Sequence, residues 1–126
     1  MGYTSALKAA GIDVLLFKHF GSYQGDWWAK VVVGNETGWI HGSFGSCSEC
    51  DAFQAEVGYE PLSNKDDPEL NEEERREWED YDARLKQFGE SYISSFVTKE
   101  EAIKIASVNL DWDHEAEGMV NFIKNN

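Results

Sequence analysis

The chain has 126 residues, a length typical of one domain, and its 24 acidic residues outnumber 11 basic ones to give a formal net charge of −13. Hydrophobic residues make up 41% of it and aromatic residues 13%, which excludes a disordered composition. The acid excess argues against a stand-alone domain that binds nucleic acid or anionic lipid, because such binding needs clustered lysine and arginine. Two cysteines exclude a scaffold of several disulfides.

The sequence pattern leads us to expect no targeting signal. The N-terminal region lacks a basic segment followed by an apolar core of about 7–15 residues, which a secretory signal requires. No apolar run approaches the roughly 18 residues of a membrane-spanning helix. We therefore expect a cytoplasmic protein without a membrane partner.

The first 45 residues predict a β-rich segment. A short helix at residues 4–10 precedes three stretches that are rich in β-branched and large apolar side chains. Glycine-rich turns separate these stretches, which fits a three-stranded antiparallel meander. The expected strands lie at residues 12–19, 27–33 and 39–44.

Residues 46–126 predict helices. The longest carries aromatic and leucine side chains at spacings of three and four, which places them on one helical face. Its expected N-cap is Asp67, with Pro68 in the first turn, and it runs to about Ser95. The other expected helices are residues 49–57 behind a Ser48 cap, a helix after the Thr98–Glu101 capping box, and a last helix after Asp113.

A three-stranded sheet cannot bury both faces alone, so we expect the long aromatic helix to pack on it. The predicted fold is α+β: a three-stranded antiparallel meander followed by a helical C-terminal half packed on the sheet. The predicted organisation is a single domain, residues 1–126, with a β-rich part at 1–45 and a helical part at 46–126.

Trp27 and Trp28 are adjacent in a predicted strand, so their side chains point to opposite faces of the sheet. One is expected in the core. The other needs cover from the N-terminal segment, a later helix or a partner. Core filling is the favoured role for both, but tryptophan is enriched at interface hot spots, and Trp28 is therefore a candidate partner-binding residue.

Cys47 and Cys50 form a Cys-x-x-Cys pair at a predicted strand-to-helix junction. With His41 they make up part of a zinc site, which normally has four ligands. Two other functional interpretations are a redox pair and a nucleophilic cysteine with His41 as base. The simplest interpretation is two small buried side chains in a turn. We expect no cofactor, with zinc as the alternative.

The densest charge lies at residues 66–82, where ten acidic side chains fall within 17 residues. On one helix they would form a negative rod of about 25 Å. Duplex DNA has a comparable charge density, about one charge per 1.7 Å. Such a rod would suit a basic protein partner, although a solvated face that aids solubility is the alternative. The candidate partner-binding residues are Asp66, Asp67, Glu69, Glu72, Glu73, Glu77, Asp80 and Trp28.

Two stretches of the sequence, GSYQGDWW at residues 21–28 and GSFGSCSECDAF at residues 42–53, resemble a group of small acidic proteins from phages and prophages. The resemblance extends loosely to Trp112-Asp113 and to residues 122–124. It implies a phage-borne accessory protein.

Small acidic phage proteins include DNA mimics that block CRISPR effectors or restriction enzymes. By analogy of charge and size, we expect a non-catalytic, anti-CRISPR-like inhibitor of a host nucleic-acid-binding defence protein, with no direct binding of nucleic acid. The alternative is a small metal-binding or thiol-dependent enzyme centred on Cys47 and Cys50.

Overall fold

The computed structural model describes residues 2–45, 51–108, 110 and 114–126, and it has an α+β fold. Within these residues no helix combines the length and the apolar character needed to cross a membrane. The elements in chain order are α1 (Tyr3–Ala9), β1 (Asp13–Phe20), β2 (Gly25–Val33), β3 (Glu36–Phe44), α2 (Ala52–Glu56), α3 (Glu72–Glu90), the 3₁₀ helix η1 (Ile93–Ser95), α4 (Lys99–Ser107) and α5 (Ala116–Lys124).

The sheet is the predicted antiparallel meander, with strand order β1-β2-β3. Its register pairs Val33 with Glu36, so only Gly34 and Asn35 connect β2 to β3. Gly34 has a φ of 63°, and a glycine at the first position of a two-residue loop is typical of a type II′ hairpin. This turn follows the natural twist of the strands and fixes which residues share a face.

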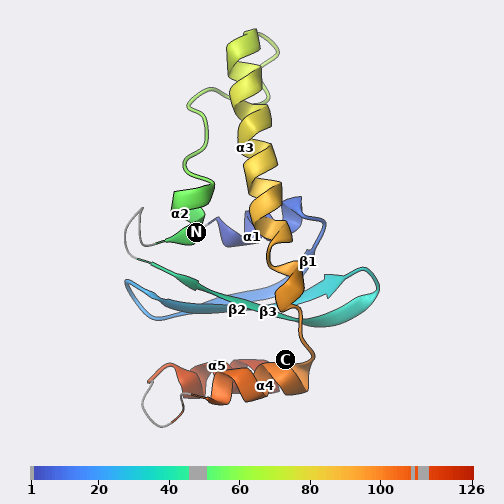
Figure 1. The fold of residues 1–126 in the computed structure, drawn as a ribbon, viewed down its shortest axis with the longest axis vertical. Coiled ribbons are helices and arrows are strands. Elements are labelled where there is room, and N and C mark those ends of the chain that lie inside the picture. Colours follow the sequence, from blue (N-terminus) through green and yellow to red (C-terminus); the bar gives the residue numbers. More distant parts are fainter. Residues whose placement is uncertain (1, 46–50, 109, 111–113) are drawn as a thin grey trace.

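Helices cover both faces of the sheet (Figure 1). On one face, Trp27 and Ile40 pack with α1 and the C-terminal end of α3. On the other, Trp28 and Trp39 pack with α4 and α5. The prediction that Trp27 and Trp28 point to opposite faces is confirmed, and a later helix supplies the cover over Trp28.

Helix α3 is anchored at one end only. Phe88 and Tyr92, at and just beyond its C-terminal end, belong to the core on the sheet, whereas the N-terminal half of α3 extends away from the sheet along the longest axis (Figure 1). Gly89 allows α1 to approach closely, since a Cβ there would lie 1.9 Å from the carbonyl oxygen of Ala6. The helix continues through Gly89 to Glu90.

The predicted start of α3 is wrong. The helix begins at Glu72 and its N-cap is Asn71, not Asp67, because Asn71 and Glu74 form a reciprocal capping box. Asp67 instead closes a local turn. The predicted helix at residues 49–57 is shorter, with Asp51 as its N-cap, and the predicted caps Ser48 and Asp113 lie outside the described residues.

Candidate functional site

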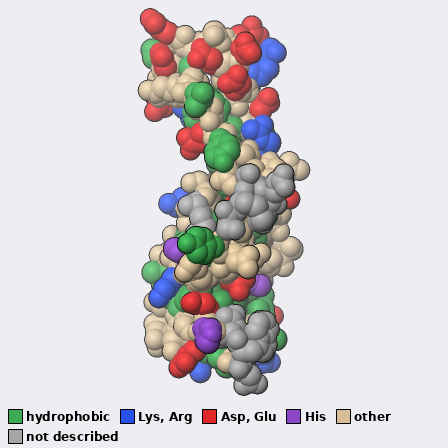
Figure 2. Space-filling view, turned by 90° about the vertical axis from the view of Figure 1, so that its left-hand side faces the viewer, with side chains coloured by type: hydrophobic (Ala, Val, Ile, Leu, Met, Phe, Trp, Pro, Cys, Tyr) green, Lys and Arg blue, Asp and Glu red, His purple; other side chains and the backbone are tan. Residues whose placement is uncertain are grey.

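The most charged part of the molecule is the segment 60–82, here called the acidic arm. It comprises the loop that runs from α2 alongside α3 to the start of that helix, together with the first half of α3 itself, and it forms one end of the molecule (Figure 1). It carries 11 acidic and three basic residues, a net charge of −8. Figure 2 shows the carboxylates gathered at this end, with few lysines or arginines among them.

Seven of the predicted partner-binding residues lie on the acidic arm, but not on one helix. The expected continuous helical rod is therefore wrong in its first part. Asp66, Asp67 and Glu69 occupy the loop, where the Asp67 side chain accepts the Glu69 N–H at 2.9 Å. Glu72, Glu73, Glu77 and Asp80 are on α3.

The helix start is built to tolerate negative charge. The Asn71 side chain accepts the Glu74 N–H at 2.8 Å, and the Glu74 carboxylate accepts the Asn71 N–H at 3.1 Å. Glu72, Glu73 and Glu74 all lie in the first turn, where the helix dipole favours carboxylates. The sequence thus places three glutamates where an α-helix accommodates them best.

Further along α3 the carboxylates divide into paired and unpaired groups. Glu72 pairs with Arg76 at 3.1 Å, and Asp82 in the middle of the helix pairs with Lys65 at 2.6 Å. On α3, all of which the structure describes, four exposed carboxylates form no ion pair: Glu73, Glu77, Glu79 and Asp80. Glu73, Glu77 and Asp80 are spaced by four and three, so they share one face of α3. This face is a stripe of uncompensated negative charge.

Trp28, the eighth predicted partner-binding residue, does not lie on this surface. Its side chain is 1% exposed beneath α4 and α5, and its ring stacks on the His41 imidazole at 4.5 Å with an interplanar angle of 19°. The sequence alone allowed either a helix or a partner to cover Trp28. In the structure α4 and α5 cover it.

Of the three residues predicted to bind metal or carry thiol chemistry, the structure describes only His41. His41 lies half-buried on β3, and burial lowers the pKa of its imidazole while the nearby Asp26 carboxylate opposes that shift. Cys47 and Cys50 lie outside the described residues. Across the described part of the chain, no three histidine, cysteine or acidic side chains gather as a metal site would require. Zinc binding at Cys47, Cys50 and His41 stays a prediction.

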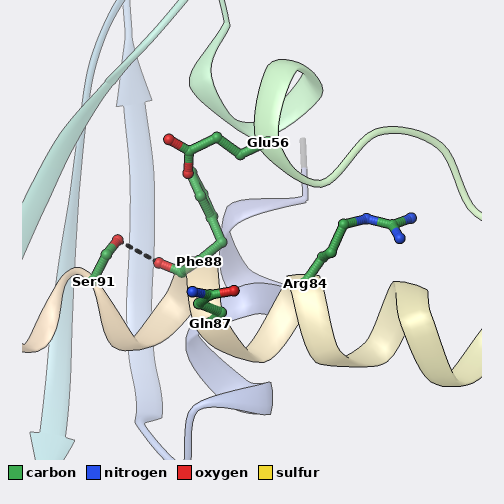
Figure 3. Close-up of a pocket in the computed structure, with 5 residues that line it drawn as sticks. All are labelled: Glu56, Arg84, Gln87, Phe88 and Ser91. Carbon is green, nitrogen blue, oxygen red and sulfur yellow. Dashed lines mark hydrogen bonds between the residues drawn. The ribbon is translucent and has the colours of Figure 1, made fainter.

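A pocket of about 390 Å³ lies beside the C-terminal half of α3 (Figure 3). Its side chains do not converge: Arg84 extends away from Glu56, and its Nε donates to the Val57 carbonyl at 3.2 Å (Figure 3). The Ser91 hydroxyl donates to the Phe88 carbonyl at 2.5 Å, and no imidazole is among the described residues that line the pocket. The Ser91 hydroxyl thus donates to a backbone carbonyl rather than to a side chain that could act as a base.

Sequence reasoning missed two exposed apolar side chains on and next to the acidic arm. Leu62 is fully exposed and Tyr59, which immediately precedes the arm, is 78% exposed. They border hollows between the loop and α3, with volumes of about 610 and 250 Å³. Neither residue belongs to a periodic pattern, so nothing in the sequence marked them as surface features.

Comparisons of the chain with protein-family models, with curated proteins and with solved structures found no match.

Proposed function

We propose that the protein is a non-catalytic, phage-type accessory protein that inhibits a host nucleic-acid-binding defence protein. The acidic arm occupies the basic surface of that partner in place of DNA, in the manner of an anti-CRISPR protein. The observation that carries this proposal is the stripe of unpaired carboxylates, Glu73, Glu77 and Asp80, on a helix half that projects from the body.

Charge density supports a DNA-like role. Seven carboxylates and two arginines lie between Glu72 and Asp82. This length of helix is about 15 Å, so the carboxylates are spaced at about one per 2 Å. Duplex DNA carries about one charge per 1.7 Å, and a protein surface that neutralises DNA phosphates would find a similar field on the arm.

The shape of the arm supports the same role. A surface must reach the partner's groove without obstruction, and the N-terminal half of α3 stands clear of the sheet and of α4 and α5 (Figure 1). The anchored end of α3 packs on α1 and the sheet, so the arm is held in place by the core.

The test measures displacement of labelled DNA from purified host defence proteins, namely a CRISPR effector complex and a restriction enzyme. We expect the protein to displace DNA from one of them, with an affinity that falls steeply as NaCl rises from about 0.05 to 0.2 M. The triple variant Glu73→Gln, Glu77→Gln, Asp80→Asn should bind that partner about tenfold more weakly and lower the salt slope by about 2.

The matched control removes the same charge elsewhere, with Glu36→Gln, Glu100→Gln and Glu117→Gln, three exposed residues off the arm. We expect this variant to inhibit as strongly as the parent protein. Equal losses in the two triple variants would show that net charge, not the arm, is responsible. Failure to displace DNA from either partner would refute the proposal.

A further inference from the structure

The acidic arm contains a groove of about 610 Å³ between its loop and α3. Its apolar lining comes from both sides. Trp78 and Leu85 are half-buried on α3, Tyr81 is buried there, and Pro61 and Leu62 contribute from the loop. Glu60 and Asp82 add carboxylates and Lys65 an ammonium group. The groove is therefore an apolar hollow within a strongly negative surface.

Contacts join the loop to α3, the two sides of the groove. The Trp78 indole Nε1 donates to the Ser63 hydroxyl at 3.1 Å. The Lys65 ammonium pairs with Asp82 and lies 5.5 Å from the centre of the Trp78 ring, so its positive charge is already neutralised. A groove fixed in this way loses little conformational entropy when a ligand binds.

Pro61 also lines a second hollow of about 250 Å³, which adjoins the first. This hollow is lined by Tyr59 together with Glu77 and Asp80, two of the unpaired carboxylates of the α3 stripe. Arg84 lines it as well, with its Nε held by the Val57 carbonyl. An aromatic face beside carboxylates is a favourable environment for a guanidinium or ammonium group.

We propose that these two adjoining hollows dock one segment of a protein partner, in which a large apolar side chain lies next to arginine or lysine. The apolar side chain packs against Trp78 and Leu62, and the cation lies between the Tyr59 ring and the carboxylates of Glu77 and Asp80. Charge complementarity selects this occupant, because the surrounding arm has a net charge of −8. This inference rests on the proposed function and adds an apolar anchor to a contact otherwise made by charge.

The experiment uses the full chain and two synthetic peptides of equal length and equal positive charge. One contains arginine and glycine, and in the other leucine replaces some of the glycines. Fluorescence anisotropy measures binding at about 0.05 and 0.2 M NaCl. We expect both peptides to bind at low salt, with the leucine peptide about tenfold tighter and retaining more affinity at high salt.

The variants Leu62→Ser and Tyr59→Ser should remove most of the advantage of the leucine peptide. The matched controls are Val108→Ser and Tyr23→Ser, because these side chains are 76% and 82% exposed away from the arm. All four side chains are exposed, so none of the changes removes core packing.

The outcomes separate the two proposals. Equal affinity for the two peptides, or equal effects of arm and control variants, would overturn the docking inference and leave the charge-based function standing. Failure of both peptides to bind at low salt would contradict the proposed function as well.

Discussion

Asp51 is the one carboxylate that is buried among the described residues. It accepts hydrogen bonds from the Tyr3 hydroxyl, from the Gly45 N–H at 3.2 Å and from the Gln54 N–H at 3.3 Å. These donors come from α1, from the residue after β3 and from α2. A buried carboxylate is tolerated when such donors surround it, so this side chain joins three parts of the fold.

Replacing Tyr3 by phenylalanine tests this role. The change keeps the ring but removes one donor to a buried charge, so the free energy of unfolding should fall by about 1.5–3 kcal/mol. Urea unfolding followed by circular dichroism measures it. Tyr23→Phe is the control, because Tyr23 is 82% exposed, and it should leave stability unchanged. Equal stability of the Tyr3 variant and the parent would show that Asp51 does not need this donor.

His41 gives the fold a pH dependence of predictable sign. Burial against Trp28 lowers the pKa of His41 below its ordinary value of 6.5, with Asp26 opposing in part. The unfolded chain therefore binds this proton first as the pH falls, and the contribution of neutral His41 to stability is present above pH 6.5 and lost below it.

We expect an NMR titration of the His41 ring to give a midpoint below 6.5. In the variant His41→Phe, which keeps an aromatic ring on Trp28, the free energy of unfolding should fall less between about pH 7.5 and 5.5 than in the parent. A midpoint above 6.5 would mean that Asp26 outweighs burial.

The start of α3 shows how local signals compete at the scale of an element. Asp67-Pro68 is a good start signal, yet Asn71 and Glu74 satisfy two backbone N–H groups together, and Asp67 is used in a turn. Asn71→Ala should therefore lower stability by about 1 kcal/mol, and Asp67→Ala should have a smaller effect. Thermal unfolding compares the two variants. The opposite order would place the functional cap at Asp67.

Repulsion within the unpaired stripe on α3 should lower the stability of the arm. Glu73 and Glu77 are four residues apart, and like charges at this spacing cost a few tenths of a kcal/mol. The variant Glu73→Gln, Glu77→Gln, Asp80→Asn should therefore melt at a higher temperature than the parent, while the proposed function predicts weaker partner binding. A lower melting temperature would mean that these carboxylates form stabilising pairs with Arg75, Arg76 or Arg84 in solution.

Much of the fold followed from local patterns. The meander was predictable because β-branched runs alternate with glycine turns, and the packing of α3 on the sheet followed from aromatic residues such as Phe88 on one face. The placement of α4 and α5 was not predictable. Helix α4 buries the small side chains of Ala102 and Ala106, which give a weak pattern, and its position depends on Trp28 and Trp39 across the sheet.

The candidate site was predictable in composition but not in shape. The carboxylates of the acidic arm were evident from the sequence. Their separation into a loop and a helix depended on the cap at Asn71, and the groove depended on tertiary contacts such as Trp78 with Ser63. Tyr59 and Leu62 lie in a loop, so no helical or strand periodicity in the sequence marks them. Their exposure depends on the path of that loop in the folded chain.

At the scale of the whole molecule, the large negative net charge lowers the stability of the folded state. The net charge is −13. The ion pairs Lys65–Asp82, Arg76–Glu72 and Lys86–Glu90 all join exposed side chains, so each contributes little to stability. Repulsion among the carboxylates of the acidic arm extends over many ångströms at low ionic strength, where the screening length is about 30 Å at 0.01 M salt. Added salt screens this repulsion and should therefore stabilise the folded state.

We expect the melting temperature to rise by a few degrees as NaCl increases from about 0.01 to 0.15 M, where the screening length falls to about 8 Å. Differential scanning calorimetry measures the change, and sucrose at equal osmolality is the control for effects unrelated to charge. The variant Glu73→Gln, Glu77→Gln, Asp80→Asn should show a smaller rise than the off-arm triple variant at Glu36, Glu100 and Glu117, because the arm concentrates the repulsion. A melting temperature that falls with salt would show that attractive pairs outweigh repulsion in this fold.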